Sequence, residues 1–135
     1  MPRVRDVMTS RLYCLQRQMT LDEAVREFDH RSISGAPVVD EQGALCGHLS
    51  RTTILHRLSR SDRPLGDWKV DEAMEDVAYE VSPDDSVKDL LAVMLPSRIH
   101  RMVVTDDEGR PAGIVTSMDL MGCLFDLLSA QEAGN

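Results

Sequence analysis

Apolar and polar residues follow two kinds of spacing along this chain, one typical of strands and the other typical of helices. Short apolar runs bounded by polar residues predict strands. The predicted strands cover residues 13–15, 36–39, 78–81 and 101–105, and others end at Leu49 and Val115. Acidic segments that end in glycine, at 40–43 and 106–109, predict hairpin turns, because glycine readily adopts the positive φ that such turns need.

Helices are predicted where apolar residues recur three and four positions apart. Thr20 with Glu23, and Ser86 with Asp89, have the spacing of capping boxes, in which a hydroxyl and an acid close the first helical turn. The expected apolar faces are Leu21, Ala24, Val25 and Phe28; Ile54, Leu55 and Leu58; Val87, Leu90, Leu91 and Met94; and Leu120, Met121, Leu124, Leu127 and Leu128. Residues 129–135 are expected to form a disordered tail.

The same order of elements occurs twice, because a shift of 66 residues aligns the two halves of the chain without a gap. Residues that match under this shift include Val4 and Val70, Met8 and Met74, Tyr13 and Tyr79, Ile33 and Ile99, Val38 and Val104, and Gly47 and Gly113. Because a single shift aligns the two halves along their whole length, the chain contains an internal duplication. Each half is a β-α-β-β-α unit, with repeats predicted at 1–62 and 70–128 and a linker at 63–69.

A single unit of this kind, with one layer of sheet and one of helix, buries too little apolar surface to be stable alone. The predicted fold is therefore α+β, with the two repeats packed sheet to sheet about a pseudo-twofold axis. The junction between the third strand and second helix of each repeat would then face a shared cleft, which makes two related pockets.

Composition narrows the classes of function. The hydrophobic share of 42% and the charged share of 28% are typical of a soluble globular protein. A net charge of −8 with scattered basic residues argues against nucleic-acid binding. No apolar run is long enough for a membrane helix or placed as a signal peptide would be, so we expect a cytoplasmic protein without a membrane partner. Cys14, Cys46 and Cys123 fit neither a disulfide framework nor a zinc motif, and the first two are expected to be buried.

The segment Gly113-Ile114-Val115-Thr116-Ser117-Met118-Asp119 combines the end of a strand, a hydroxyl and an acid at the start of a helix. Free backbone N–H groups at such a junction can hold a sugar or phosphate. Spacing alone favours an ordinary capping box between Thr116 and Asp119. A charged carboxylate can also accept two hydrogen bonds from a cis-diol, and both roles can coexist. The chain holds an altered copy of the segment at residues 47–53.

The doubled pattern resembles a tandem pair of cystathionine-β-synthase (CBS) domains, the Bateman module. The segments that carry the resemblance are Val7-Met8-Thr9, Ile33-Ser34-Gly35-Ala36-Pro37-Val38-Val39-Asp40, Ile99-His100-Arg101-Met102-Val103-Val104 and residues 113–119. The resemblance implies a regulatory module for adenosine compounds, namely AMP, ADP or ATP and sometimes S-adenosylmethionine. It also implies a homodimer formed through helices. Together with the duplication, it favours the ligand role of Asp119 over the purely capping role.

The resemblance also implies residue roles in a main adenosine site. Asp119 would accept hydrogen bonds from both ribose hydroxyls, Ile114 would line the adenine slot, and Thr116 would hold sugar or phosphate. The other residues expected there are Thr9, Tyr13, Ile33 and Ser34, where backbone groups would read the adenine edge.

The related site of the first repeat departs from the family pattern at two positions. Thr53 stands where the ribose-binding acid belongs, and His48 replaces the usual apolar adenine neighbour. This second site is therefore expected to be weak, empty or specialised. The residues assigned to it are His48, Ser50, Tyr79, His100 and Arg101. Arg101 is either a phosphate clamp or an ordinary surface arginine, and no metal site is expected.

The main hypothesis from the sequence is a sensor of adenine nucleotide that regulates an unidentified protein, requires no cofactor and is not an enzyme. The second is a ligand-blind scaffold for dimerisation or partner docking, which the loss of the acid at Thr53 favours. Catalysis is a distant third, because the chain shows no nucleophile–base pair, metal cluster or phosphate-binding loop.

Overall fold

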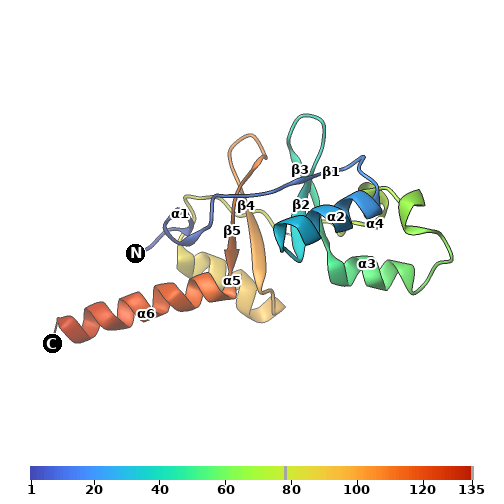
Figure 1. The fold of residues 1–135 in the computed structure, drawn as a ribbon. Coiled ribbons are helices and arrows are strands. Elements are labelled where there is room, and N and C mark those ends of the chain that lie inside the picture. The colour runs from blue at the N-terminus through green and yellow to red at the C-terminus, as the bar shows by residue number, and fades with distance from the viewer. Residues whose placement is uncertain (78, 135) are drawn as a thin grey trace. The chain divides into compact units, whose positions relative to one another are not determined.

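The computed structural model describes residues 1–77 and 79–134, which divide into two compact units. The first-repeat unit comprises residues 13–79 and 108–111, and the second-repeat unit comprises residues 1–12, 80–107 and 112 onward. Figure 1 shows strands and helices mixed within each unit, which confirms the predicted α+β class. None of the helices in the described ranges has the length and hydropathy needed to cross a bilayer.

The first-repeat unit is built on a three-stranded sheet in the order β1-β2-β3. Strand β2 pairs in parallel with β1 and antiparallel with β3, with a register shift between Val38 and Val39. Its elements are β1 (Leu15–Gln16), α2 (Leu21–Arg31), β2 (Gly35–Val39), β3 (Leu45–Ser50), α3 (Arg51–Leu58), the 3-10 helix η1 (Leu65–Asp67) and α4 (Val70–Ala73). Gly43 has a φ of 83° in the hairpin turn between β2 and β3, as predicted.

The core of this unit lies between the sheet and α2. Leu21, Ala24 and Phe28 project from the predicted face of α2 and are fully buried, as are Leu15 and Leu49 of the sheet. Trp68 packs partly buried against this core, and the Arg63 guanidinium lies 4.7 Å from the centre of its ring. The apolar spacing along residues 21–28 therefore predicted the buried face correctly.

The second-repeat unit has a two-stranded sheet, β4-β5, and repeats the same helix–strand order. Its elements are α1 (Val4–Val7), α5 (Val87–Ser97), β4 (Arg101–Thr105), β5 (Pro111–Thr116) and α6 (Ser117–Ala133). Leu90 and Met94 of α5 pack with Val104 and Val115 of the strands. Gly109, the turn glycine between β4 and β5, has a φ of 78°.

Two short helices pack in the other repeat's unit. Helix α1 begins the first repeat in the sequence but packs in the second-repeat unit, and α4 begins the second repeat but packs in the first-repeat unit. Val4 of α1 is fully buried in the core of the second-repeat unit, and its backbone N–H donates to Asp85 O at 2.8 Å. Val70 of α4 is fully buried in the core of the first-repeat unit and donates to Met19 O at 2.7 Å. The compact units thus differ from the sequence repeats. The repeat boundaries predicted at 1–62 and 70–128 stay predictions. The sheet-to-sheet packing of the repeats also stays a prediction.

Five local predictions were wrong wholly or in part. The strand expected at 13–15 begins only at Leu15, and residues 79–81 form no strand, while Ala78 lies outside the described residues. Residues 129–133 are helical, because neither glycine nor proline interrupts α6 between Gly122 and Gly134. Thr20 does not cap α2, since its hydroxyl donates to Asp22 instead. Cys14 and Cys46 are half-buried rather than buried, and this burial raises the pKa of both thiols.

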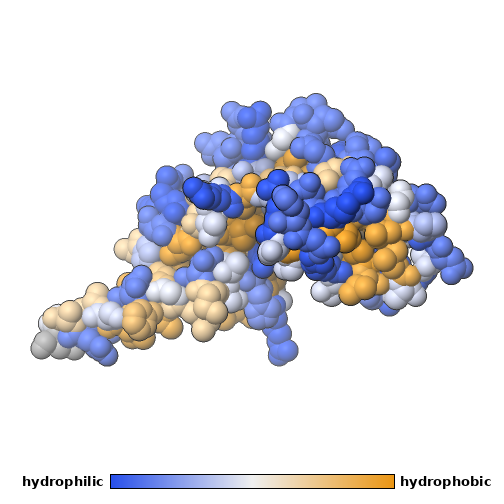
Figure 2. Space-filling model, viewed as in Figure 1, coloured by the Kyte–Doolittle hydropathy of each residue, from blue (hydrophilic) through white to orange (hydrophobic). Residues whose placement is uncertain are grey.

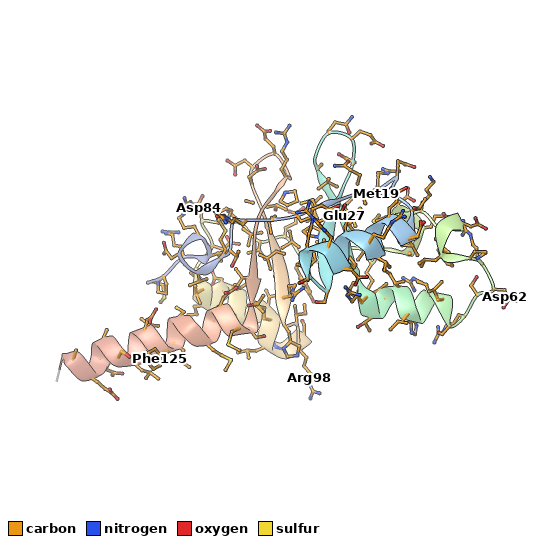
Figure 3. The ribbon with its side chains drawn as sticks, in the orientation of Figure 1. Met19, Glu27, Asp62, Asp84, Arg98 and Phe125 are labelled. Carbon is orange, nitrogen blue, oxygen red and sulfur yellow. The ribbon has the colours of Figure 1, made fainter. Side chains whose placement is uncertain are left out.

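The apolar face predicted for α6 packs against the core of its unit at Leu120, which is partly buried, and is mostly exposed beyond it. No described residue of α6 is buried, although the helix has 17 residues. Apolar residues lie along its length in Figure 2, and the side chain of Phe125 stands out from it in Figure 3. The exposed apolar side chains of α6 are Met118, Met121, Leu124, Phe125, Leu127 and Leu128.

Candidate functional site

The junction between β5 and α6 forms the capping box that the spacing allowed. The Thr116 hydroxyl accepts the backbone N–H of Asp119 at 3.2 Å. In return, Asp119 Oδ2 accepts the backbone N–H of Thr116 at 2.8 Å and its hydroxyl at 3.0 Å. Within the described part of the chain, no hydrogen-bond donor lies on Asp119 Oδ1. The carboxylate is thus held by one oxygen, and the other is available as a strong acceptor.

Thr9 and Ile114 lie beside this junction, in the same unit. Their backbones form an antiparallel bridge, in which each N–H donates to the other residue's carbonyl at 2.9 Å. Gly113 permits this approach, because a Cβ added there would lie 2.7 Å from Met8 Sδ and 3.0 Å from Thr9 O. The structure therefore brings Thr9, Ile114, Thr116 and Asp119 together at the end of β5.

Asp119 also lines a hollow of about 560 Å³ on the second-repeat unit. Two further carboxylates, Asp6 and Asp126, line the same hollow, together with Val7 and Cys123. An acidic lining disfavours a polyphosphate inside the hollow through like-charge repulsion. A neutral sugar or a cationic group is the better chemical match.

Tyr13, Ile33 and Ser34 belong to the first-repeat unit. One face of the Tyr13 ring is covered by the Arg31 guanidinium, 3.8 Å from the ring centre. Burial, and then the nearby charge of Glu27, raises the pKa of Tyr13, so its hydroxyl stays protonated at neutral pH.

The carbonyl groups of Ile33 and Ser34 are already engaged. Arg51 donates its Nε–H to Ile33 O at 3.3 Å and its backbone N–H to Ser34 O at 2.9 Å. Each carbonyl oxygen keeps a second lone pair. The predicted role of this backbone in reading an adenine edge stays a prediction.

The residues predicted for the second site are divided between the two units, with His48, Ser50 and Tyr79 in the first-repeat unit and His100 and Arg101 in the second-repeat unit. His48 and Ser50 lie on β3, and the Ser50 hydroxyl accepts the backbone N–H of Thr53 at 3.2 Å. His100 precedes β4, and its Nδ1 lies 3.2 Å from the Ser117 hydroxyl. Arg101 and Tyr79 are exposed. The two interpretations of Arg101, phosphate clamp or surface arginine, both stay open.

One polar residue near the first-repeat junction was missed. The Thr53 hydroxyl donates to Glu75 Oε1 at 2.9 Å, and Thr53 is only 7% exposed. Glu75 and His48 form a backbone bridge with N–H···O distances of 2.8 and 2.9 Å. The sequence held a signal for this residue, because the 66-residue shift aligns Glu75 with Thr9.

Comparison with known proteins agrees with the duplicated architecture. The family model described as "CBS domain" matches residues 4–60 and 70–126. The uncharacterised protein MJ1404 of Methanocaldococcus jannaschii is 30% identical over 131 residues, which is 97% of this chain and 31% of that protein. The chain thus spans about a third of the length of this curated relative.

Two solved structures share the fold. The protein CBSX2, crystallised with AMP, has a TM-score of 0.80 at 22% identity, over 94% of this chain and 98% of that chain. The CBS domain pair of protein MJ0100, crystallised with 5′-methylthioadenosine and S-adenosyl-L-methionine, has a TM-score of 0.78 at 24% identity, over 93% and 98% of the two chains. At these identities the likeness extends to the fold alone.

Proposed function

The chain belongs to the CBS domain family, and on this premise we propose that it is a regulatory module that binds an adenosine compound and catalyses no reaction. The observation that carries the proposal is the hydrogen bonding of the Asp119 carboxylate. Its Oδ2 is used in the helix cap, while no donor in the described part of the chain occupies its Oδ1. A ribose hydroxyl donating to that oxygen would form a charge-assisted hydrogen bond.

The neighbouring groups support a sugar at this position. The cap orients the carboxylate, so little side-chain entropy is lost when a ligand binds. Ile114 is half-buried beside it and offers an apolar surface to a base. In this proposal Asp119 would contact the ribose and Ile114 the adenine of a bound adenosine. Tyr13, Ile33 and Ser34 remain proposed contributors from the first repeat.

The bound compounds of the two structural neighbours suggest which ligands to test. AMP is bound by one of them, and 5′-methylthioadenosine and S-adenosylmethionine by the other. Adenosine is common to all of these molecules and to ADP and ATP. Binding would act by population shift, since the ligand stabilises the conformation that it binds better and a partner protein responds to that conformation.

A ligand-blind scaffold is the second candidate, and the exposed face of α6 favours it. Met118 and Phe125 are 71% and 69% exposed, and Leu95 of α5 is 71% exposed. Clusters of exposed apolar side chains are typical of protein interfaces. We propose a homodimer through this face under either function.

Thermal melts with AMP, ADP, ATP and S-adenosylmethionine distinguish the two candidates. A ligand present at 100 times its Kd adds about 2.7 kcal/mol to the free energy of unfolding, which raises Tm by several degrees in a chain of this size. A rise with at least one of the four ligands supports the sensor. Unchanged Tm with all four supports the scaffold.

Asp119→Ala tests the residue that carries the proposal. Loss of a charged acceptor is expected to weaken binding roughly ten- to a hundredfold, which reduces the ligand-induced rise in Tm. The substitution also removes a helix cap, so the rise caused by ligand is compared and not Tm itself. Asp89→Ala is the matched control, because Asp89 holds the same third position of helix α5, where its N–H donates to Ser86 Oγ. Equal reductions in both variants would contradict the assignment.

A further inference from the structure

In each repeat a short segment forms a backbone bridge to the last strand just before that strand leads into a helix. We call this bridge, together with the strand–helix junction, a frame: residues 9 and 113–119 in the second-repeat unit, and residues 75 and 47–53 in the first-repeat unit. In one frame Thr9 bridges Ile114, and in the other Glu75 bridges His48. Both frames need a glycine, since a Cβ on Gly47 would lie 2.9 Å from Glu75 O, as one on Gly113 would lie 3.0 Å from Thr9 O. Position 75 of the first-repeat frame is therefore the structural equivalent of position 9.

The acid and the threonine have exchanged positions between the two frames. The frame around β5 has a threonine on the bridging segment and an acid, Asp119, on the helix. The frame around β3 has a threonine, Thr53, on the helix and an acid, Glu75, on the bridging segment. At these two positions each frame thus keeps one carboxylate and one threonine, although the carboxylate comes from a different element.

The Glu75 carboxylate is both positioned and accessible. The backbone bridge to His48 holds its main chain, and the buried hydroxyl of Thr53 donates to Oε1 at 2.9 Å. The residue itself is exposed, and within residues 1–77 and 79–134 no donor lies on its Oε2. Glu75 therefore has more unused acceptor capacity than Asp119, whose Oδ2 accepts two hydrogen bonds.

We propose that the first repeat carries a second site for a ribose-type cis-diol, in which Glu75 supplies the carboxylate that position 53 lacks. Thr53 is a positioning residue, which orients Glu75 through its hydroxyl. The inference rests on the proposed function of Asp119, because the equivalence of the two frames carries the ligand class from one to the other. The chain then binds two adenosine compounds and not one.

Equilibrium dialysis of the full chain with AMP, and separately with S-adenosylmethionine, measures the number of ligands bound per chain. The expected number is two for at least one of these probes. Glu75→Gln keeps the shape of the side chain and removes its charge, and is expected to weaken one of the two sites roughly ten- to a hundredfold. Asp119→Ala weakens the other site, and the double variant loses both. The 2′-deoxy form of AMP, when AMP is the bound probe, binds both sites more weakly.

Glu41→Gln is the matched control, because Glu41 is an exposed glutamate of the same unit and the substitution changes the charge equally. One bound ligand, unaffected by Glu75→Gln and lost in Asp119→Ala, overturns this inference and leaves the proposed function standing. Equal weakening by the Glu41 and Glu75 variants also overturns it, since the effect is then one of net charge. Binding of neither probe overturns both proposals.

Discussion

Gly113 and Gly122 differ in the space around them, although both belong to the β5–α6 region. An added Cβ on Gly113 meets the Met8 side chain and the Thr9 carbonyl, whereas nothing lies within 4 Å of one on Gly122. We expect Gly113→Ala to destabilise the protein by about 1–3 kcal/mol, because the bridging segment must move. Gly122→Ala is expected to stabilise α6 by about 0.5–1 kcal/mol. Urea unfolding of both variants measures the difference.

Displacement of Thr9 by an alanine at 113 should also weaken ligand binding, since Thr9 lies at the proposed site. Gly122→Ala is the control and should leave ligand binding unchanged, because it leaves the bridge between Thr9 and Ile114 intact. If Gly113→Ala were as stable as the natural protein, the close approach of the two segments would be wrong.

At the residue scale, the sequence predicted the local pair Thr116 and Asp119 because its members are three positions apart. The contact between Thr53 and Glu75 spans 22 positions, and no local rule connects such residues. Only the repeat register relates Glu75 to Thr9, and it does so without revealing that a carboxylate and a hydroxyl have exchanged places.

Helix α4 has only four residues, and the Glu72 side chain caps its start. Glu72 accepts the backbone N–H of Lys69 at 2.8 Å, and Arg63 donates to both of its carboxylate oxygens at 2.9 Å. The Lys69 N–H and then the Arg63 guanidinium hold the pKa of Glu72 below its usual 4.5. Because the folded-state pKa is lowered, this contribution to stability is present above pH 4.5 and is lost as the pH falls through the folded-state pKa.

Glu72→Gln is therefore expected to lower Tm slightly at pH 7 and to have less effect on Tm at pH 3. Gln can still accept the cap hydrogen bond, so the difference isolates the charge. Thermal melts at the two pH values measure it, with Glu41→Gln as the exposed control. A difference in Tm that stays constant between pH 7 and pH 3 would contradict this role.

At the element scale, the long amphipathic helices were predictable and the short helices were not. Leu21, Ala24 and Phe28 recur with the helical period, which identifies both the helix and its buried face. Helices α1 and α4 contain too few residues for a period, and isolated helices of that length are unstable in water. They form because Val4 and Val70 are buried in cores made by distant residues.

The exposed apolar face of α6 predicts the assembly of the whole molecule. Phe125 and Leu124 are expected to be buried between two copies, and Phe125→Lys should raise the Kd of the dimer at least roughly tenfold, since it removes a large apolar side chain from the interface. Sedimentation velocity over a range of concentrations measures this Kd.

Gln131→Lys, which adds the same charge to an exposed position of α6, is the control and should leave the dimer intact. A natural chain that sediments as a monomer at every concentration would contradict the proposed homodimer. The fold of the monomer should survive Phe125→Lys, because no described residue of α6 is buried.

The sequence by itself determined the duplication, the class of the fold and the capping pair of Thr116 and Asp119. These depend on period and register, which are properties of neighbouring residues and of one repeated spacing. Tertiary structure alone decided that α1 and α4 each pack on the core of the other repeat, that Glu75 meets Thr53, and that α6 leaves most of its apolar face exposed. The physical reason is that burial and hydrogen bonding between distant segments depend on which surfaces meet in space, and no local pattern of residues contains that information.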